Sequence, residues 1–190
     1  MDIAEKKVAI VIDNYFEEAE FTEPLKALKD AALEVTVIGV SSKDLQSMQH
    51  AKLSSEYQAD VLLGQADPDD YDALVLPGGA MNADTLRMNQ TARDWAKYFL
   101  DKGKPVAAIC HAPWLLVSAG CVKGRTLTSF WTIQDDIRNA GGTWQDSSVV
   151  IDGTLITSRK PDDLPDFCDA LLKMLQEQHN EQLNKEVYDA

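Results

Sequence analysis

The fold is decided by residues 7–14, which read Lys-Val-Ala-Ile-Val-Ile-Asp-Asn. This continuous apolar run, closed by a polar pair, predicts a strand that is buried on both faces, which is typical of a parallel sheet. Apolar side chains then recur at helical spacing over residues 18–32, and a second β-rich run follows at 34–40. The chain therefore opens as a β-α-β unit.

The alternation of strands and helices continues along the chain. The segments that predict further strands or hairpins are 52–65, 71–76, 104–109 and 149–157, the last with Asp-Gly at its turn. The segments that predict helices are 90–100, 111–118, 133–140 and 162–175. This order predicts a doubly wound α/β fold of the flavodoxin-like kind, in which helices sandwich a mostly parallel sheet.

We expect a single domain over residues 1–190, because a chain of 190 residues buries enough surface for one core of ordinary size. The packed part spans about residues 7–175. The polar residues 176–190 are expected to fray as a C-terminal tail.

The charge balance is strongly acidic, with 18 Lys and Arg against 31 Asp and Glu and a net charge of −13. Such a surface repels phosphate backbones and anionic lipids, so direct binding of nucleic acid is not expected. The amino terminus lacks the features of a signal peptide, and no apolar run approaches the ~20 residues that cross a bilayer. The sequence thus predicts a cytoplasmic protein without membrane contact.

Chemistry-bearing residues follow three of the predicted strands. Ligands of such sheets bind in the crevice outside the carboxyl ends of the strands. The segments at those ends are 13–17, Gly78-Gly79 and Cys110-His111. We therefore expect an acid, a glycine pair and a cysteine to converge on one crevice.

Cys110 lies between a buried strand and a short helix, a strand-turn-helix that forms a nucleophile elbow. The helix amino terminus is expected to lower the thiol pKa and so to make the sulfur reactive. The alternative is a small buried apolar residue, as most free cysteines are. Cys121 and Cys168 form no disulfide or metal pattern with it, and we interpret both as packing thiols.

The neighbours of Cys110 each allow two interpretations. His111 is either a partner of the thiol or a packing residue, and Gly78-Gly79 is either a tight turn or a source of backbone N–H groups for an oxyanion. The acids at 17, 18 and 20 are typical of a helix amino terminus, and one of them could face the crevice.

Several motifs together resemble the ThiJ/PfpI (DJ-one) superfamily, and in particular its PfpI-like intracellular cysteine protease family. The resemblance covers about residues 7–175. The matching segments are Asp-Asn-Tyr-Phe-Glu-Glu-Ala-Glu at 13–20, Leu-Val-Leu-Pro-Gly-Gly at 74–79, Ala-Ile-Cys-His-Ala-Pro at 108–113 and Asp-Asp-Ile-Arg-Asn-Ala-Gly at 135–141.

The resemblance implies a role for each matching site residue. Cys110 is implied as the nucleophile, His111 as its catalytic partner and Glu17 as the acid that contacts the sulfur. The implied oxyanion donors are the backbone amides of Gly79 and His111, and Trp114 and Phe130 are expected to line the crevice.

The family completes its triad with an acid from a neighbouring subunit. Counting back from Leu86-Arg87 assigns this role to Asp84, although the preceding segment is one residue longer than the family pattern and the acid is Asp rather than Glu. The resemblance therefore implies a homo-oligomer, a dimer or larger.

Three functions remain open. The first is a stress-response enzyme, either a glyoxalase or a deglycase, that acts through Cys110 on small carbonyl compounds or on glycated protein or peptide. This enzyme is expected to need no cofactor and no metal. The second is an intracellular cysteine peptidase, and the third is a redox sensor or chaperone that uses oxidation of Cys110.

Overall fold

A seven-stranded sheet forms the centre of the computed structural model, which describes residue 3 and residues 6–188. In spatial order its strands are β11 (Val149–Asp152), β12 (Leu155–Ser158), β8 (Val106–Ile109), β7 (Ala73–Leu76), β1 (Lys7–Ile12), β3 (Glu34–Gly39) and β6 (Val61–Leu62). All neighbours pair in parallel except β11 and β12, which form the antiparallel hairpin predicted at 149–157.

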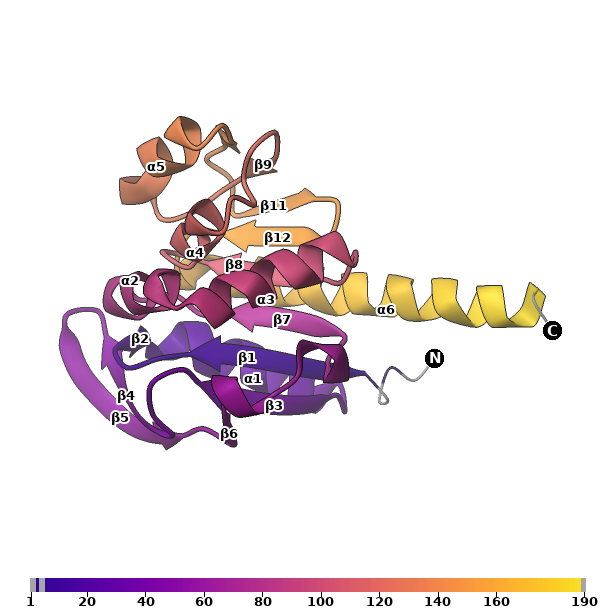
Figure 1. The fold of residues 1–190 in the computed structure, drawn as a ribbon, viewed down its shortest axis with the longest axis horizontal. Coiled ribbons are helices and arrows are strands. Elements are labelled where there is room, and N and C mark those ends of the chain that lie inside the picture. The colour runs from indigo at the N-terminus through magenta and orange to yellow at the C-terminus, as the bar shows by residue number, and fades with distance from the viewer. Residues whose placement is uncertain (1–2, 4–5, 189–190) are drawn as a thin grey trace.

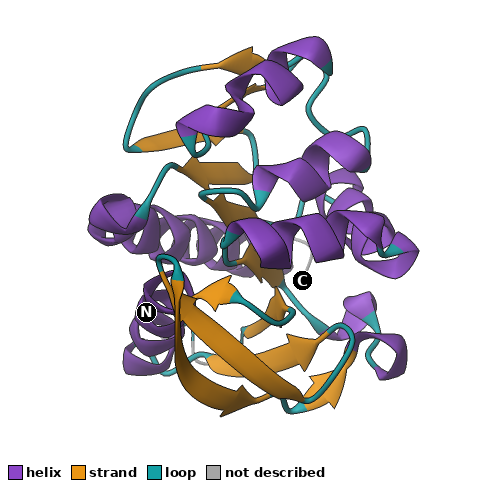
Figure 2. Ribbon diagram, turned by 90° about the vertical axis from the view of Figure 1, so that its left-hand side faces the viewer, coloured by secondary structure: helices purple, strands orange, loops and turns teal. Residues whose placement is uncertain are grey.

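Helices cover both faces of this sheet. They are α1 (Glu18–Asp30), α2 (Ala80–Met88), α3 (Gln90–Asp101), α4 (Pro113–Ser118), α5 (Gln134–Asn139) and α6 (Leu164–Tyr188). Figure 1 shows α2 and α3 in front of the sheet and α6 behind it, and Figure 2 shows helices on both sides of the strands. The predicted doubly wound α/β sandwich is confirmed.

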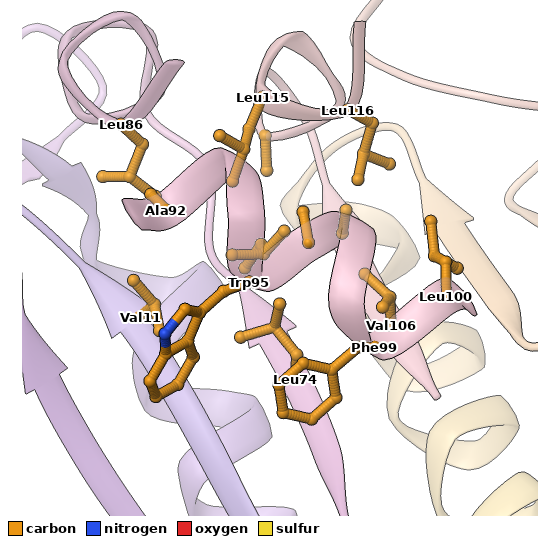
Figure 3. Packing of buried hydrophobic residues seen from close by; sticks show 14 of the residues in the cluster. Val11, Leu74, Leu86, Ala92, Trp95, Phe99, Leu100, Val106, Leu115 and Leu116 are labelled. Carbon is orange, nitrogen blue, oxygen red and sulfur yellow. The ribbon is translucent and has the colours of Figure 1, made fainter. Parts of the chain in front are cut away.

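Each layer of helices has its own core. One cluster packs α2, α3 and α4 on the sheet around Trp95, Phe99 and Leu116, as Figure 3 shows. The other packs α1 and α6 on the opposite face around Phe21, Leu28 and Phe167. Because β1, β7 and β8 lie between the clusters, their residues are almost wholly buried, as the apolar run at 7–12 predicts.

The small elements lie at the margins of the sheet. A three-stranded sheet consists of β2 (Phe16–Glu17), β4 (Asp44–Gln49) and β5 (Lys52–Gln58), and a two-stranded one of β9 (Thr126–Leu127) and β10 (Thr143–Trp144). Short 3-10 turns occupy Leu63–Gln65, Pro68–Asp70, Trp131–Ile133 and Pro161–Asp163. The range 52–65, predicted as a small hairpin or an edge strand, instead contains two separate strands. Of these, β5 pairs with the preceding β4, which lies outside that range, and β6 forms an edge of the main sheet.

Two helices depart from the sequence expectations. The sequence predicts no helix over residues 80–88, but they form α2. Residues 176–188, expected to fray, continue α6, because they are rich in helix-forming Gln, Glu and Lys and are tied to the domain. Lys6 Nζ donates to Gln182 Oε1 at 2.6 Å and Gln178 Nε2 donates to the Gly103 carbonyl at 2.9 Å. None of the described helices is long and apolar enough to cross a membrane.

Glu18 joins the β4–β5 hairpin to α1. Its carboxylate accepts hydrogen bonds from the hydroxyls of Ser54 at 2.6 Å, Tyr57 at 2.7 Å and Ser47 at 3.2 Å. These hydroxyls, that of Ser54 foremost, lower the pKa of Glu18 from 4.5 to about 2. The hairpin therefore depends on an ionised carboxylate.

This carboxylate predicts a pH-dependent stability. Because the pKa of Glu18 is lower in the folded than in the unfolded chain, its stabilisation is complete above pH 4.5 and is lost as the pH falls toward about 2. We expect Glu18→Gln to cost about 1 kcal/mol at neutral pH and progressively less over that interval. Urea unfolding of both proteins at a series of pH values measures the difference, and a difference independent of pH would contradict this account.

Candidate active site

A pocket of about 440 Å³ opens at the carboxyl edge of the sheet. Its walls come from the ends of β1, β7 and β8, as the doubly wound topology predicts. The residues that line it include Tyr15, Glu17, Glu20, Met48, His50, Gly79, Met81, Cys110, His111 and Phe130. The expected convergence of an acid, a glycine pair and a cysteine is therefore observed.

Cys110 occupies the sharp turn between β8 and α4. Its φ of +64° lies in the left-handed region, which is unusual for a residue with a side chain and is found at strained functional turns. Its backbone is held on both sides, because its N–H donates to the Ser158 carbonyl at 3.0 Å and its carbonyl accepts from the Phe130 N–H at 2.8 Å. These bonds fix the nucleophile elbow, with the cysteine 7% exposed at the pocket.

The turn after β7 passes very close to the cysteine. A Cβ on Gly78 would lie 2.6 Å from Cys110 Cβ and 2.2 Å from Glu20 Oε2, so a larger residue would displace both. Gly79 has a φ of +89°, which also favours glycine. The backbone N–H groups of Gly79 and His111 both act to lower the pKa of the Cys110 thiol, as donors directed toward the sulfur. The two amides implied as oxyanion donors thus converge at the thiol.

The acid beside the sulfur is Glu20, not Glu17. Glu20 is completely buried, and neither carboxyl oxygen has a hydrogen-bond partner of ordinary geometry among the described residues. Burial is the largest cause of a pKa of about 8 for Glu20. The charge of Glu17 acts in the same direction, and the Cys110 thiol and the Gly78 amide oppose it. Glu20 is therefore protonated at neutral pH and carries a proton that it can donate to the sulfur.

Glu17 lines the same pocket but has a different task. It is the N-cap residue of α1, in an extended conformation that turns it toward the tip of the β4–β5 hairpin. Its two oxygens accept from the His50 N–H at 3.2 and 2.9 Å. The implied contact between Glu17 and the sulfur is therefore wrong. The helix begins at Glu18, and of the three acids only Glu20, three positions after the N-cap, is buried.

His111 contacts the thiol directly. Its Nδ1 lies 3.1 Å from Cys110 Sγ, its Nε2 lies 3.2 Å from Thr132 Oγ1, and its ring stacks on Phe130 at 4.8 Å between centroids. Burial lowers the pKa of His111, so the ring is neutral at neutral pH. A neutral ring with its proton on Nε2 accepts a hydrogen bond from the thiol and donates one to Thr132. The contact between Thr132 and His111 was not predicted, because the two residues are 21 positions apart in the sequence.

The thiol pKa differs from the sequence expectation. Burial raises the pKa of Cys110 well above its ordinary value, and an ionised Glu20 would raise it further. The expected lowering by a helix terminus is not found, because α4 has six residues and begins only at Pro113. The resting site therefore holds a neutral thiol, a neutral imidazole and a neutral carboxylic acid.

Two other predicted site residues lie elsewhere. Trp114 is not part of the pocket wall; it packs on the core cluster, 5.5 Å from the His111 ring and under the Arg87 guanidinium. Asp84 is exposed on α2 and makes no contact with His111 of its own chain. Phe130 does line the pocket, as expected. Among the described residues no three His, Cys, Asp or Glu side chains gather as a metal site.

The fold and the site define a class: doubly wound α/β proteins with a cysteine at a nucleophile elbow, beside a histidine and a buried carboxyl. A sequence profile of the DJ-1/PfpI family matches residues 6–174. This chain belongs to the DJ-1/PfpI family.

Several proteins resemble the chain over nearly its whole length. An uncharacterized protein of Archaeoglobus fulgidus is 44% identical over 89% of this chain and 98% of its own, and one of Staphylococcus aureus is 42% identical over 90% and 99%. A two-domain Anabaena variabilis protein with DJ-1/ThiJ/PfpI-like and ferritin-like domains shares 37% identity, with a TM-score of 0.84 over 90% of this chain and 48% of that one. Drosophila melanogaster DJ-1beta shares 29%, with a TM-score of 0.80 over 91% and 90%.

Proposed function

We propose that the protein is an enzyme that uses the Cys110 thiol to convert small reactive carbonyl compounds, with methylglyoxal as the simplest test substrate. The observation that carries this proposal is the 3.1 Å contact between Cys110 Sγ and His111 Nδ1, in a pocket that also holds the protonated Glu20. The proposed role is removal of such carbonyls in the cytoplasm under stress.

The neutral site is suited to attack on an aldehyde. As Sγ forms a bond to the aldehyde carbon, the thiol proton passes to His111 Nδ1 and the π pair of the carbonyl moves to its oxygen. The amides of Gly79 and His111, which act on the sulfur, are the proposed donors to that oxygen. The product is a hemithioacetal on Cys110, and the proton from His111 neutralises the alkoxide.

The remaining steps need only water. The hydrogen on the former aldehyde carbon leaves as a proton and the ketone carbon gains one. The hydroxyl proton of the hemithioacetal also passes to the former ketone oxygen, so the hemithioacetal becomes a lactoyl thioester. Water then cleaves the C–S bond, releases lactic acid and restores the thiol. One carbon is oxidised and its neighbour is reduced, so methylglyoxal and one water give one lactic acid without an external oxidant. On an early glyoxal adduct of an amine, Sγ would instead displace the amine from the carbinolamine carbon: the C–S bond forms, the C–N bond breaks, and the thiol proton passes through His111 to the leaving nitrogen.

The pocket favours a small substrate over a peptide. It measures about 440 Å³, and Tyr15, Met48, Met81 and Phe130 are among the residues that line it. A volume of this size accommodates a three-carbon carbonyl or a single modified side chain. We therefore rank the peptidase below the carbonyl enzyme.

The test is to incubate the purified protein with methylglyoxal and to measure substrate loss and lactate together. The proposal predicts saturable loss with one lactate per methylglyoxal, and slower or no cleavage of fluorogenic peptides. Rapid peptide cleavage with no lactate would favour the peptidase instead. Loss of methylglyoxal without lactate would indicate simple adduct formation and contradict turnover.

A redox role is the second candidate, and the isolated carboxyl of Glu20 favours it. This carboxyl has a proton and no ordinary hydrogen-bond partner, so it can donate to an oxygen added to Cys110 Sγ. One peroxide would convert the thiol to the sulfenic acid and a second would give the sulfinic acid, each releasing water. Mass spectrometry after mild peroxide should find oxygen on Cys110 before Cys121 or Cys168; the reverse order would exclude this role.

The enzyme is also proposed to act as a homo-oligomer. The outer face of α2 carries Met81, Asp84 and Met88 at helical spacing, with the methionines 53% and 74% exposed. Exposed apolar side chains around an acid suit contact with a second copy. In that arrangement Asp84 of one subunit would approach Nε2 of His111 in the other subunit. Within one chain, this nitrogen contacts Thr132 Oγ1.

We expect a mixture of inactive Asp84→Ala and inactive Cys110→Ala subunits to recover part of the wild-type rate. Recovery follows because some sites in mixed oligomers combine a wild-type Cys110 and His111 with a wild-type Asp84 from the other subunit. Native mass spectrometry of differently tagged subunits confirms exchange. Exchange without recovery would show that the triad is not shared between subunits, and would leave Thr132 as the partner of His111.

A further inference from the structure

Asn82, in the first turns of α2, is a polar residue with no exposed surface. Its side-chain Nδ2 donates to the Pro77 carbonyl and to the Gly78 carbonyl, both at 2.9 Å. Its Oδ1 accepts from the Asp13 N–H at 2.7 Å. One amide group therefore joins the end of β1 to the turn that follows β7.

This pattern fixes the orientation of the Asn82 amide. The NH2 group faces two carbonyls and the oxygen faces an N–H. In the opposite orientation the Asn82 oxygen would face the Pro77 and Gly78 carbonyl oxygens, and the NH2 group would face the Asp13 N–H. An apolar residue of similar volume would leave the Asp13 N–H and one or both carbonyls without partners. The site is thus specific for a planar group with two donors and one acceptor.

The Gly78 carbonyl is the important one of these partners. It belongs to the same peptide plane as the Gly79 N–H, and in a trans peptide the two point in opposite directions. Asn82 Nδ2 and the Glu17 N–H, at 3.3 Å, both hold that carbonyl on one side. The Gly79 N–H is consequently turned to the other side. The turn lies against the cysteine, since a Cβ on Gly78 would be 2.6 Å from Cys110 Cβ, and the Gly79 amide acts to lower the pKa of the Cys110 thiol.

We propose that Asn82 is a positioning residue of the active site, which fixes the Gly78–Gly79 peptide plane so that the Gly79 N–H is aimed at the reacting sulfur and at the oxyanion formed beside it. This inference rests on the proposed function for its catalytic consequence. Asn82 itself does not touch the substrate pocket. Glycine at positions 78 and 79 permits the turn to approach Cys110 closely. Because glycine allows many backbone conformations, the hydrogen bonds of Asn82 are needed to hold the Gly78–Gly79 peptide plane in one orientation.

Two substitutions test this role. Asn82→Asp keeps the shape and removes the donors to the carbonyls, and Asn82→Ala removes all three hydrogen bonds without adding a charge. We expect each to lower kcat for methylglyoxal roughly 10²-fold, the usual effect of losing one oxyanion donor, with KM changed less than about threefold. The pKa of Cys110, measured from the pH dependence of its alkylation by iodoacetamide, should rise in both.

Leu86→Ala is the matched control. Leu86 is buried in the same helix and packs in the core cluster of Figure 3, but its side chain offers no hydrogen bond to the turn. The Leu86→Ala substitution should lower the melting temperature. It should leave kcat within about twofold of the wild-type value and the pKa measured by alkylation within about 0.3 units of it. Asn82→Ala behaving like Leu86→Ala would overturn the proposal, as would a pKa rise confined to the charged Asn82→Asp.

The alkylation readout needs no turnover, so it decides the role of Asn82 even if methylglyoxal is not a substrate. If the Asn82 variants do not fold, NMR of the wild-type protein decides instead. The proposal then predicts slow solvent exchange for both Asn82 side-chain amide protons and a Gly79 amide resonance that titrates with Cys110. Fast exchange, or a Gly79 resonance unaffected by the thiol, would reject it.

Discussion

Cys110→Ser should lower the rate of methylglyoxal conversion by about 10³-fold or more while leaving the fold unchanged. Serine is close in size and can occupy the same buried turn. Its hydroxyl, however, has a far higher pKa than a thiol and is a weak nucleophile, which the single neutral His111 activates poorly. The measurement is the initial rate of lactate formation, with circular dichroism to verify folding.

The other cysteines provide the control. Cys121 packs at the edge of the core and Cys168 is buried on α6, and neither lines the pocket. Cys121→Ser and Cys168→Ser should keep at least about half of the wild-type rate. A folded Cys110→Ser with substantial activity would refute the assignment of the nucleophile, and an essential Cys121 or Cys168 would refute their role in packing alone.

The second large effect is expected at Glu20. Glu20→Gln keeps a neutral donor of the same shape, whereas Glu20→Leu leaves the sulfur without one. The apolar variant should therefore have a higher Cys110 pKa than the Gln variant and should lose roughly 10²-fold in rate. In wild type, alkylation of Cys110 should show a coupled titration with one ionisation near pH 8 from Glu20, and Glu20→Gln should reduce this to a single ionisation.

Glu17→Gln is the control for Glu20, because its carboxylate binds the His50 N–H rather than the sulfur. It should leave the Cys110 pKa within about 0.5 units of wild type. Equal thiol pKa values in Glu20→Gln and Glu20→Leu would contradict hydrogen bonding from Glu20. If the Cys110 pKa changed more in Glu17→Gln than in either Glu20 variant, Glu17 would be the acid that hydrogen-bonds the sulfur.

Much of the fold follows from hydrophobic periodicity. The unbroken apolar run at 7–12 has the signature of a strand covered on both faces, and β1 is indeed central. The helix α2 was missed because residues 80–88 contain Asn, Asp and Thr, which are typical of loops, and only Ala83 and Leu86 are apolar and buried. Asn82 is buried for its hydrogen bonds, a property that no pattern of hydrophobicity detects.

The site was predicted in outline because topology brings the strand ends together. The choice among the acids at 17, 18 and 20 required the start of α1, which the sequence left open. A signal for Glu20 was present, however, since it lies four residues before Pro24 and eight before Leu28, on the buried stripe that also contains Phe21. An acid at the head of an apolar stripe indicates a buried carboxyl. The contact of Thr132 with His111 depends on a turn distant in sequence and had no such signal.

The central claim is that the Cys110 sulfur bonds covalently to a small carbonyl carbon. The most direct test is peptide-resolved mass spectrometry of the wild-type protein quenched in acid during turnover of methylglyoxal. The account predicts one methylglyoxal-derived adduct on the peptide containing Cys110, which disappears as the substrate is exhausted and never forms in Cys110→Ser. Turnover to lactate with no adduct on Cys110, or with the adduct on Cys121, Cys168 or a lysine, would contradict it.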